Sequence, residues 1–313
     1  MPAPLLQVEG LTRRFGALTA VQDLSLEVYP GEIFGFLGPN GAGKTTSISM
    51  MCGLLRPDAG RVLLAGRPLC RGDGALRART GVAPQNVVVW TRLTCLEQLI
   101  FVGQMYGLPA ASARRRAEEL LEAMGLAEKR AQLAATLSGG MQRRLNLILA
   151  LVHDPEVLIL DEPEAGLDPQ SRVLVRDYVR AWAAAPGHTV ILTSHNMDEV
   201  ERLASRVAII DHGRLLVTGA PEALKRQAGG GDVLEVDVPL PHCHPALAAV
   251  QAVLPGATLA GSALSLRQAQ AIDALPALLA ALQAAGIPHG EVRLRQTSLE
   301  DVFIALTGRR LRQ

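Results

Sequence analysis

Hydrophobic positions along the chain alternate between short apolar runs and longer segments with helical spacing. The runs Ile33–Leu37, Val157–Leu160 and Val190–Leu192 are almost wholly apolar, which is typical of strands that helices cover on both faces. The predicted strands are Leu6–Glu9, Leu24–Val28, Ile33–Leu37, Arg61–Leu64, Val157–Leu160, Thr189–Thr193 and Val207–Asp211. The predicted helices are Lys44–Cys52, Cys95–Tyr106, Ser112–Met124, Gly139–His153, Pro169–Ala184 and Asp198–Ala204. This alternation predicts an α/β fold with a mainly parallel sheet.

The pattern changes at two places, and both suggest how the chain is divided. Residues 94–135 contain no convincing strand, so we expect a helical insert over about residues 86–135. Gly229-Gly230-Gly231 predicts a linker, because three consecutive glycines do not hold one backbone conformation cheaply. We therefore expect a first domain over residues 1–228 and a small α+β domain over residues 232–313.

The second domain shows the order βαββαβ followed by a helix, as in a split βαβ module. Its predicted strands are Val233–Val238, Thr258–Ala260, Ala263–Leu266 and Glu291–Arg295, and its predicted helices are Pro245–Leu254, Ala271–Ala285 and Ser298–Leu306.

Composition narrows the functional classes. Lys and Arg number 31 against 30 for Asp and Glu in the 313 residues, a net charge of +1 that argues against a nucleic-acid coat or a polybasic membrane binder. The four cysteines are far apart, which predicts no disulfide framework and fits a reducing cytosol. No secretory signal is visible at the start, and the apolar runs are shorter than the ~20 residues of a membrane span.

A phosphate-binding loop is the strongest chemical signal. Gly38-Pro39-Asn40-Gly41-Ala42-Gly43-Lys44-Thr45 matches the pattern GxxxxGK[ST], between a predicted strand and a predicted helix. Its glycines let backbone N–H groups surround phosphates, Lys44 can bridge the β- and γ-phosphates, and the Thr45 hydroxyl can bind Mg²⁺. The alternative is a glycine-rich turn with a chance Lys-Thr, and the strand–helix context disfavours it. The predicted nucleotide contacts of this loop are Gly38, Pro39, Asn40, Gly41, Ala42, Gly43, Lys44, Thr45 and Thr46.

Two acids, Asp161 and Glu162, end the apolar strand Val157–Leu160. Next to a phosphate loop, an acid at the carboxyl end of a strand can hold Mg²⁺, which suits Asp161. Glu162 can then polarise the attacking water as a general base. The alternative is a strand that ends in two solvated acids.

The segment Leu137-Ser138-Gly139-Gly140-Met141-Gln142 resembles the LSGGQ-type signature of ATP-binding cassette (ABC) ATPases. Further family elements stand in the family's order over about residues 5–225, namely Phe15, Gln85, Asp168 and His195. The resemblance implies a P-loop NTPase cassette, with a RecA-like core, antiparallel N-terminal strands and a helical insert.

The resemblance also implies how the site is completed. In the family, two cassettes close head to tail around two ATP molecules, so Ser138, Gly139 and Gly140 would bind the ATP held by the second cassette. A bare helix start suits such an anion. Asp168 would communicate between the two sites, although it also suits an N-cap before Pro169.

Three more roles follow from matching positions. Gln85 would contact Mg²⁺ and the attacking water, His195 would contact the γ-phosphate and support Glu162, and Phe15 would stack on adenine. The plain alternatives are a turn residue for Gln85, a structural histidine for His195 and a core side chain for Phe15. Glu164 departs from the family, which commonly has Thr, Ser or Phe there; we expect hydrolysis to be retained because Glu162 is present.

The tail Ser298–Gly308 resembles cassettes that serve ABC-2-type permeases, such as the daunorubicin-resistance group. This implies an ATPase subunit of an exporter of drugs, lipids, polysaccharides or ions, at the cytoplasmic face of the membrane. Its partners would be ATP, a second cassette and a separate permease docked near Val87–Tyr106, with no nucleic acid. The alternatives are an importer ATPase, a soluble ABC protein of translation or DNA repair, and an unrelated phosphate-loop kinase; the kinase does not explain the LSGG segment.

Overall fold

The computed structural model describes residues 3–69, 73–228, 231–268 and 270–308. Its internal contacts divide the chain into a first unit, Met1–Ala220, and a second unit, Pro221–Leu311. The division therefore precedes the boundary that the sequence predicts at residue 228. Helix α8 (Pro221–Gln227) packs against α11 (Leu299–Thr307), which places it with the second unit. Gly229 and Gly230 lie outside the described residues, and the carbonyl of Gly231 accepts from the N–H of Thr297, 3.1 Å away.

A six-stranded sheet forms the centre of the first unit. In the order β10-β9-β3-β8-β7-β6, its strands are Arg214–Gly219, Arg206–Asp211, Ile33–Leu37, Thr189–Ser194, Val157–Asp161 and Thr80–Ala83. Every neighbouring pair is parallel except β10 and β9. The α/β fold with a mainly parallel sheet is thereby confirmed. The carboxyl ends of β3, β8, β7 and β6 consequently meet at one edge of the sheet.

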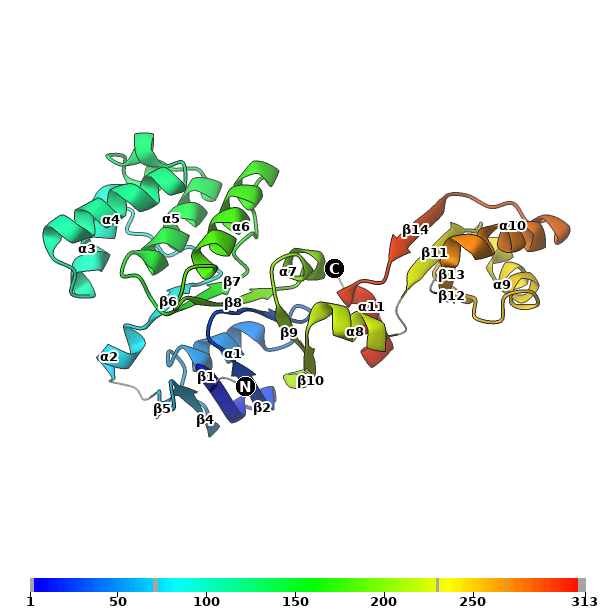
Figure 1. Ribbon diagram of the computed structural model, residues 1–313, viewed down its shortest axis with the longest axis horizontal. Helices are drawn as coiled ribbons and strands as arrows, with labels where there is room; N and C mark the ends of the chain where they lie inside the picture. The colour runs from blue at the N-terminus through cyan, green and yellow to red at the C-terminus, as the bar shows by residue number, and fades with distance from the viewer. Residues whose placement is uncertain (1–2, 70–72, 229–230, 269, 309–313) are drawn as a thin grey trace. The chain divides into compact units, whose positions relative to one another are not determined.

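Helices cover both faces of this sheet, as the apolar strands require. Figure 1 shows α5 (Gly139–Leu151) and α6 (Pro169–Ala183) on one side of the strands and α1 (Lys44–Met51) on the other. The short α7 (Met197–Glu201) follows β8 and packs against β3 and β8. All residues of β3, β7 and β8 are buried, so these three strands form the core of the unit.

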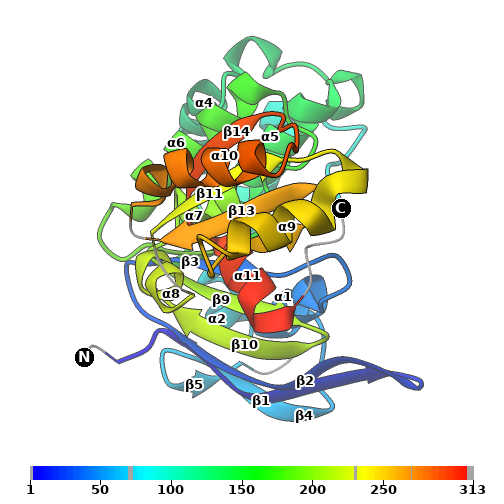
Figure 2. The ribbon, with the colours of Figure 1, turned by 90° about the vertical axis from the view of Figure 1, so that its right-hand side faces the viewer.

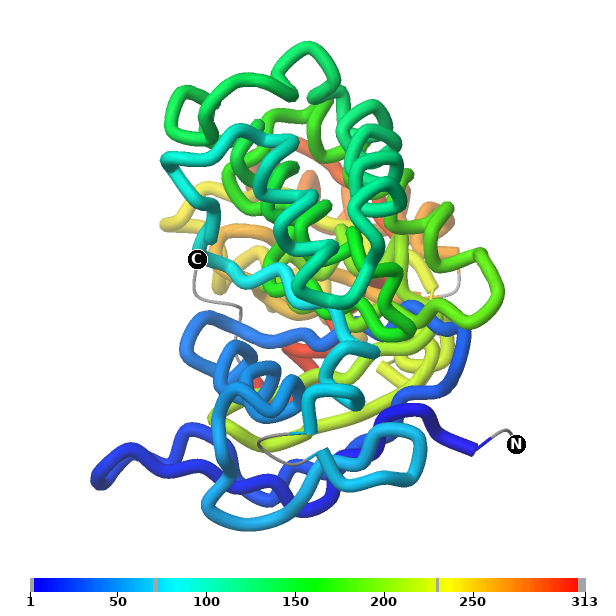
Figure 3. Tube along the Cα trace, turned by 90° about the vertical axis from the view of Figure 1, so that its left-hand side faces the viewer, coloured from blue at the N-terminus to red at the C-terminus, as the bar shows by residue number. Residues whose placement is uncertain are grey.

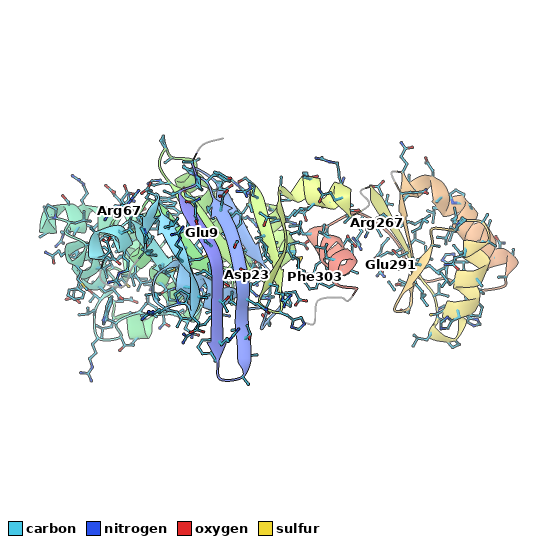
Figure 4. The ribbon with its side chains drawn as sticks, turned by 90° about the horizontal axis from the view of Figure 1, so that it is seen from below. Glu9, Asp23, Arg67, Arg267, Glu291 and Phe303 are labelled. Atoms are coloured by element: carbon cyan, nitrogen blue, oxygen red, sulfur yellow. The ribbon has the colours of Figure 1, made fainter. Side chains whose placement is uncertain are left out.

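An antiparallel sheet lies on the far side of α1. Its strands, in the order β2-β1-β4-β5, are Leu18–Val28, Leu6–Phe15, Ala59–Leu64 and Arg67–Pro68. Figure 4 labels Glu9 on β1 and Asp23 on β2. Buried side chains of β1, β2, β4 and α1 join those of β3 and β7 in one hydrophobic cluster. Helix α1 is therefore held between two sheets, which fixes the loop that precedes it.

The helical insert contains α3 (Cys95–Met105) and α4 (Ala110–Ala123), followed by two short 3-10 turns, Ala127–Lys129 and Ala134–Thr136. Figure 3 shows these helices together at one end of the unit, and both pack against α5. Thr94 and Glu97 form a capping box that starts α3. Only an isolated bridge between Thr94 and Leu133 interrupts the helical character of residues 94–135, which confirms the prediction for that block.

The second unit is a four-stranded antiparallel sheet with two helices on one face. In the order β12-β13-β11-β14, its strands are Thr258–Ala260, Ala263–Gln268, Asp232–Asp237 and Val292–Gln296. Figure 2 shows α9 (Cys243–Gln251) and α10 (Leu275–Ala284) lying over this sheet, and short 3-10 turns, Leu240–His242 and Ala271–Ala274, precede them. This order confirms the predicted split βαβ module.

A buried carboxylate fastens the last helix to that sheet. Asp301 on α11 accepts hydrogen bonds from Arg295 on β14, at 2.6 Å, and from the N–H of Ser298, at 2.8 Å. Burial raises the pKa of Asp301, but these bonds outweigh it and bring the pKa to about 2. Figure 4 labels Arg267, which also pairs with Asp301, and Phe303 on α11.

Several elements differ from the predictions. Strands β6 and β10 and helices α2 (Gly74–Arg77) and α8 were not predicted, and β1 and β2 are longer than expected. Helix α7 begins at Met197 rather than Asp198, because the Asn196 side chain caps it, and it ends at Glu201 rather than Ala204. No helix within the described ranges has both the length and the apolar character needed to cross a membrane.

Candidate functional site

Four segments that are distant in the sequence meet at the carboxyl edge of the central sheet. The loop Gly38–Gly43 follows β3, Gln85 follows β6, Asp161 and Glu162 follow from β7, and His195 follows β8. Because β3, β8, β7 and β6 are neighbours in the sheet, the fold places these side chains along one edge. The sequence predictions for this cluster are therefore brought together in space.

Two glycines of the loop are required by close backbone approaches. A Cβ on Gly38 would lie 2.5 Å from the carbonyl oxygen of Ile210. Gly43 has φ of 100° in the left-handed region, and a Cβ there would lie 2.4 Å from the carbonyl oxygen of Ala20. No side chain caps the start of α1, so its first N–H groups point into the loop without a side-chain acceptor. This loop can therefore bind an anion with backbone donors.

Lys44 lies buried beneath this loop. Its ammonium group donates to the carbonyl oxygens of Gly38, at 2.8 Å, and Pro39, at 3.2 Å. Its Nζ also lies 3.6 Å from Oε1 of Glu162. Burial lowers the pKa of Lys44, and the nearby Glu162 carboxylate partly opposes that effect. The carbonyl groups of Gly38 and Pro39 thus hold the Lys44 ammonium group against the phosphate loop.

Asp161 joins the phosphate loop to the neighbouring strand. The Thr45 hydroxyl donates to Oδ2 of Asp161 at 3.0 Å, and the Thr193 hydroxyl donates to Oδ1. The Asp161 side chain is buried, and its two oxygens are fixed by hydroxyl groups from α1 and β8. A hydroxyl and a carboxylate oxygen at this spacing are the donor types that Mg²⁺ prefers.

Glu162 is the centre of the cluster. Its Oε1 lies 3.1 Å from Nδ1 of His195, and its Oε2 accepts from the Gln85 amide at 3.3 Å. The Glu162 side chain is 8% exposed, whereas the His195 side chain is 52% exposed. A cation, an amide and an imidazole therefore surround one buried carboxylate, and the residues that carry the amide and the imidazole are exposed.

The backbone of Glu162 is strained. Its φ of 50° lies in the left-handed region, which side-chain-bearing residues seldom adopt. Its N–H donates to the Thr193 hydroxyl at 3.0 Å and to the Thr193 carbonyl at 3.2 Å, which holds the residue in this conformation. Strain of this kind persists only where the surroundings determine the conformation, and it clusters at functional sites.

The remaining predicted site residues lie outside this network within the described part of the chain. Ser138 caps α5 by accepting from the N–H of Met141 at 3.3 Å, and Ser138 and Gly139 are exposed. Asp168 caps α6 by accepting from the N–H of Ser171, which confirms the plain N-cap interpretation. Phe15 is 47% exposed at the end of β1, so the core alternative for this residue is wrong.

Two contributors to the cluster were missed in the sequence. Thr193 binds both Asp161 and Glu162, and it occupies the β8 position that pairs with Asp161 across the sheet. Arg143, on the second turn of α5, donates to the carbonyl oxygens of Gln85, Asp161 and Glu162. For Thr193, the only signal in the sequence was its position at the end of the predicted strand Thr189–Thr193. For Arg143, nothing in the sequence indicated burial, because it stands beside a second arginine, Arg144.

Comparison with known proteins decides the family. A family model described as "ABC transporter" matches residues 21–165. The Nod factor export ATP-binding protein I of Paraburkholderia xenovorans (strain LB400) is 42% identical over 99% of this chain and 99% of its own length. The daunorubicin resistance ATP-binding protein DrrA3 of Streptomyces coeruleorubidus is 40% identical over 97% of this chain and 96% of its own. This chain belongs to the ABC transporter family. It is an ATP-binding subunit of that family, and it is an ATPase.

Solved structures agree with this assignment for the cassette. A structure described as the ATP binding subunit of an ABC transporter has a TM-score of 0.67 and 29% identity, and it covers 72% of this chain and 93% of its own. The cbiO1 subunit of Clostridium perfringens has a TM-score of 0.64 and 27% identity, over 72% of this chain and 91% of its own. The fold class predicted from the sequence is therefore confirmed as that of an ABC cassette.

Glu164, the departure from the usual cassette pattern, is buried two residues after Glu162. Burial raises the pKa of its carboxyl, the neighbouring Glu199 raises it further, and Arg176, Arg172 and Arg202 oppose this. The charged form is thus disfavoured in the folded cassette.

We expect Glu164→Gln to stabilise the cassette at neutral pH. Because the pKa of Glu164 is raised in the folded state, ionisation of this carboxyl lowers the free energy of unfolding. The full free energy of unfolding is present below the ordinary glutamate pKa of about 4.3, and part of it is lost as pH rises through the folded-state pKa. The variant should raise Tm at pH 7.5 by roughly 2–4 °C, the shift for about 1 kcal/mol in a domain of this size, and the gain should disappear near pH 4. Thermal unfolding at both pH values measures this, and a lower Tm at pH 7.5 would show that the three arginines dominate.

Proposed function

We propose that this ABC cassette drives export through a separate membrane permease, docked at the cytoplasmic face of the membrane. One observation carries the export proposal: relatives named for Nod factor export and for daunorubicin or linearmycin resistance match this chain along nearly its whole length, second unit included. The cargo would be chosen by the permease, which is a different chain.

We further propose roles for the cluster residues in hydrolysis. Mg²⁺ would be held by Thr45 and Asp161, with Gln85 alongside, and it would neutralise charge on the phosphates during transfer. Glu162 accepts the proton of the attacking water, because a carboxylate can act as a general base and both oxygens of the neighbouring Asp161 already accept from hydroxyl groups. The Lys44 ammonium exchanges its loop carbonyls for the β- and γ-phosphates, and these carbonyls lie within 3.2 Å of it.

His195 and Gln85 position Glu162 in this proposal. His195 follows β8 and approaches Oε1 of Glu162, and Gln85 follows β6 and donates to Oε2. Each carboxylate oxygen therefore has its own partner. The His195 side chain is 52% exposed, which supports a contact between its imidazole and the γ-phosphate. Phe15 would stack on adenine, supported by its exposure and by the Arg13 guanidinium, which lies 4.9 Å from the ring centroid.

Two cassettes would close head to tail, with the Ser138 helix start of one cassette on the ATP of the other. Support comes from the exposure of Ser138 and Gly139, and a Cβ on Gly139 would meet no atom within 4 Å. The loop of each cassette already surrounds its own phosphates, so a second bare helix start is available for the partner's ATP. Asp168 lies beside this tip, with its Oδ2 3.8 Å from the Cβ that Gly140 would carry.

An apolar groove beside the Gln85 loop supports docking of a permease helix. The groove has a volume of about 890 Å³. Its lining includes Val88 and Trp90 from the loop after Gln85, Met105 from the end of α3 and Tyr106, the next residue. These four side chains are at least 42% exposed, an unusual concentration of apolar surface. An amphipathic helix at the cytoplasmic end of the permease would cover this groove.

We expect Val88→Glu to disrupt the docking without affecting hydrolysis by the isolated chain. A carboxylate in the groove would have to be desolvated by the permease helix, so recovery of the cassette with its permease from detergent extracts should fall about tenfold or more. Basal ATP hydrolysis should stay within twofold of the wild type. Val253→Glu is the matched control, because Val253 is 55% exposed against 59% for Val88 and belongs to the second unit. Equal recovery of both variants would overturn the docking proposal.

A further inference from the structure

One buried arginine binds the backbone of two segments that carry the catalytic cluster, at Gln85 and at residues 161–163. Arg143 is 8% exposed on α5, and its guanidinium donates to the carbonyl oxygens of Gln85, Asp161 and Glu162, the second at 3.2 Å. Its Nε lies 3.5 Å from the carbonyl oxygen of Pro163. These four acceptors are all main-chain oxygens, and they belong to Gln85 and to residues 161–163.

Only a guanidinium can make this set of contacts. Its five N–H donors form a rigid planar fork, whereas the lysine ammonium is a single point with three donors. Burying a cation without a carboxylate partner is costly, and here the nearby Asp161 and Glu162 charges offset part of that cost. A cation retained under these conditions fixes the relative position of the loops that it joins.

A second side chain, one helical turn further along α5, binds the same loop. The Asn146 amide donates to the carbonyl oxygen of Pro84 at 3.3 Å, and its oxygen accepts from the N–H of Val88 at 3.1 Å. Asn146 is buried, so both of its hydrogen-bonding groups are used by the loop. Residues 84, 85 and 88 are thus held by α5 from two successive turns, and Val88 and Asn146 also line the groove.

We propose that Arg143 and Asn146 are positioning residues that hold the Gln85 amide against the Glu162 carboxylate during hydrolysis. The proposal rests on the roles proposed above for Gln85 and Glu162. Arg143 sets the distance between the Gln85 loop and the end of β7. Asn146 binds the Gln85 loop and also lines the groove, so a change in the groove would move the same loop. Neither residue contacts the nucleotide; they act through the loop that carries Gln85 and the strand end that carries Glu162.

The first test is Arg143→Met in the full chain. Because it releases both loops without touching the phosphate loop, kcat should fall about tenfold to a hundredfold, the cost of misplacing a catalytic group by about 1 Å. KM and the equilibrium Kd for MgATP should stay within twofold. Arg143→Lys should recover only a small part of kcat. Arg206→Met removes a partly buried arginine that pairs with Glu32 at the amino ends of β9 and β3. This variant controls for loss of stability and should keep its kcat.

The decisive comparison is a double mutant. If Arg143 acts through Gln85, the Arg143→Met/Gln85→Ala variant should turn over no more slowly than the slower single variant. Multiplicative losses in the double variant, an unchanged kcat in Arg143→Met, or a kcat loss matched by Arg206→Met would overturn the proposal. If Arg143→Met does not fold, Asn146→Ala carries the test, with a several-fold fall in kcat at unchanged KM. Failure of the roles themselves would appear separately, as normal turnover in Glu162→Gln with Arg143 intact.

Discussion

Glu162→Gln is expected to lower kcat for ATP hydrolysis by about 10²- to 10⁴-fold, the range for removing a general base. The amide is nearly the same size as the carboxylate and still accepts from the Gln85 amide, so the fold and the nucleotide site should remain. It cannot take the proton of the attacking water. Equilibrium binding of MgATP should therefore be unchanged or tighter, while phosphate release assays show almost no turnover.

Glu164→Gln is the matched control for this result. Glu164 is also a buried carboxylate, only two residues away, but its charged neighbours are Glu199 and three arginines rather than Lys44 and His195. Its replacement should leave kcat within about threefold of the wild type. If Glu162→Gln turned over ATP normally and Glu164→Gln did not, the general base would be Glu164, and the assignment drawn from the geometry around Glu162 would be wrong.

Ser138→Arg is expected to abolish cooperative ATP hydrolysis, with kcat reduced about a hundredfold or more. The Arg side chain would occupy the exposed helix start where the phosphates of the second cassette must approach, and it would remove the cap on the N–H of Met141. The phosphate loop of the same chain is unaffected. A filter-binding or fluorescence titration should therefore still give a wild-type Kd for MgATP at the monomer's own loop.

Ala111→Arg provides the same change of charge at the exposed start of another helix, in the insert. Ala111 lies in the first turn of α4, and we expect its variant to hydrolyse ATP like the wild type. Equal loss in the two variants would point to a general effect of added positive charge on the cassette, and normal activity in Ser138→Arg would contradict the head-to-tail arrangement.

The site was predictable where a residue type, a spacing and a strand end coincide. The phosphate loop, Asp161 and Glu162 all follow apolar strands, and parallel strands place their carboxyl ends together. Strand β6 was missed because Thr80–Ala83 is short and contains a glycine, Gly81. The glycine is needed there because a Cβ at this position would lie 2.0 Å from the carbonyl oxygen of Ala150. Gln85 was nevertheless placed from the family's order, and β6 explains why it reaches Glu162.

The supporting side chains were not predictable in the same way. Thr193, Arg143 and Asn146 act through long-range hydrogen bonds to backbone atoms of other segments, and no local pattern encodes such a partner. The buried side of α5 could not be predicted without knowing where the insert lies, because α3 and α4 of the insert pack against α5. The division of contacts after Ala220 differs from the predicted boundary at residue 228 for a related reason. Helix α8 has one buried leucine, Leu224, and its partner α11 lies at the other end of the unit's sequence.

The measurement that tests the head-to-tail account most directly is the molecular mass of Glu162→Gln in solution, by light scattering, with and without MgATP. This variant should hold ATP without hydrolysing it, so the account predicts a dimer with saturating MgATP and a monomer without nucleotide. A monomeric mass with bound MgATP confirmed in the same sample would contradict it.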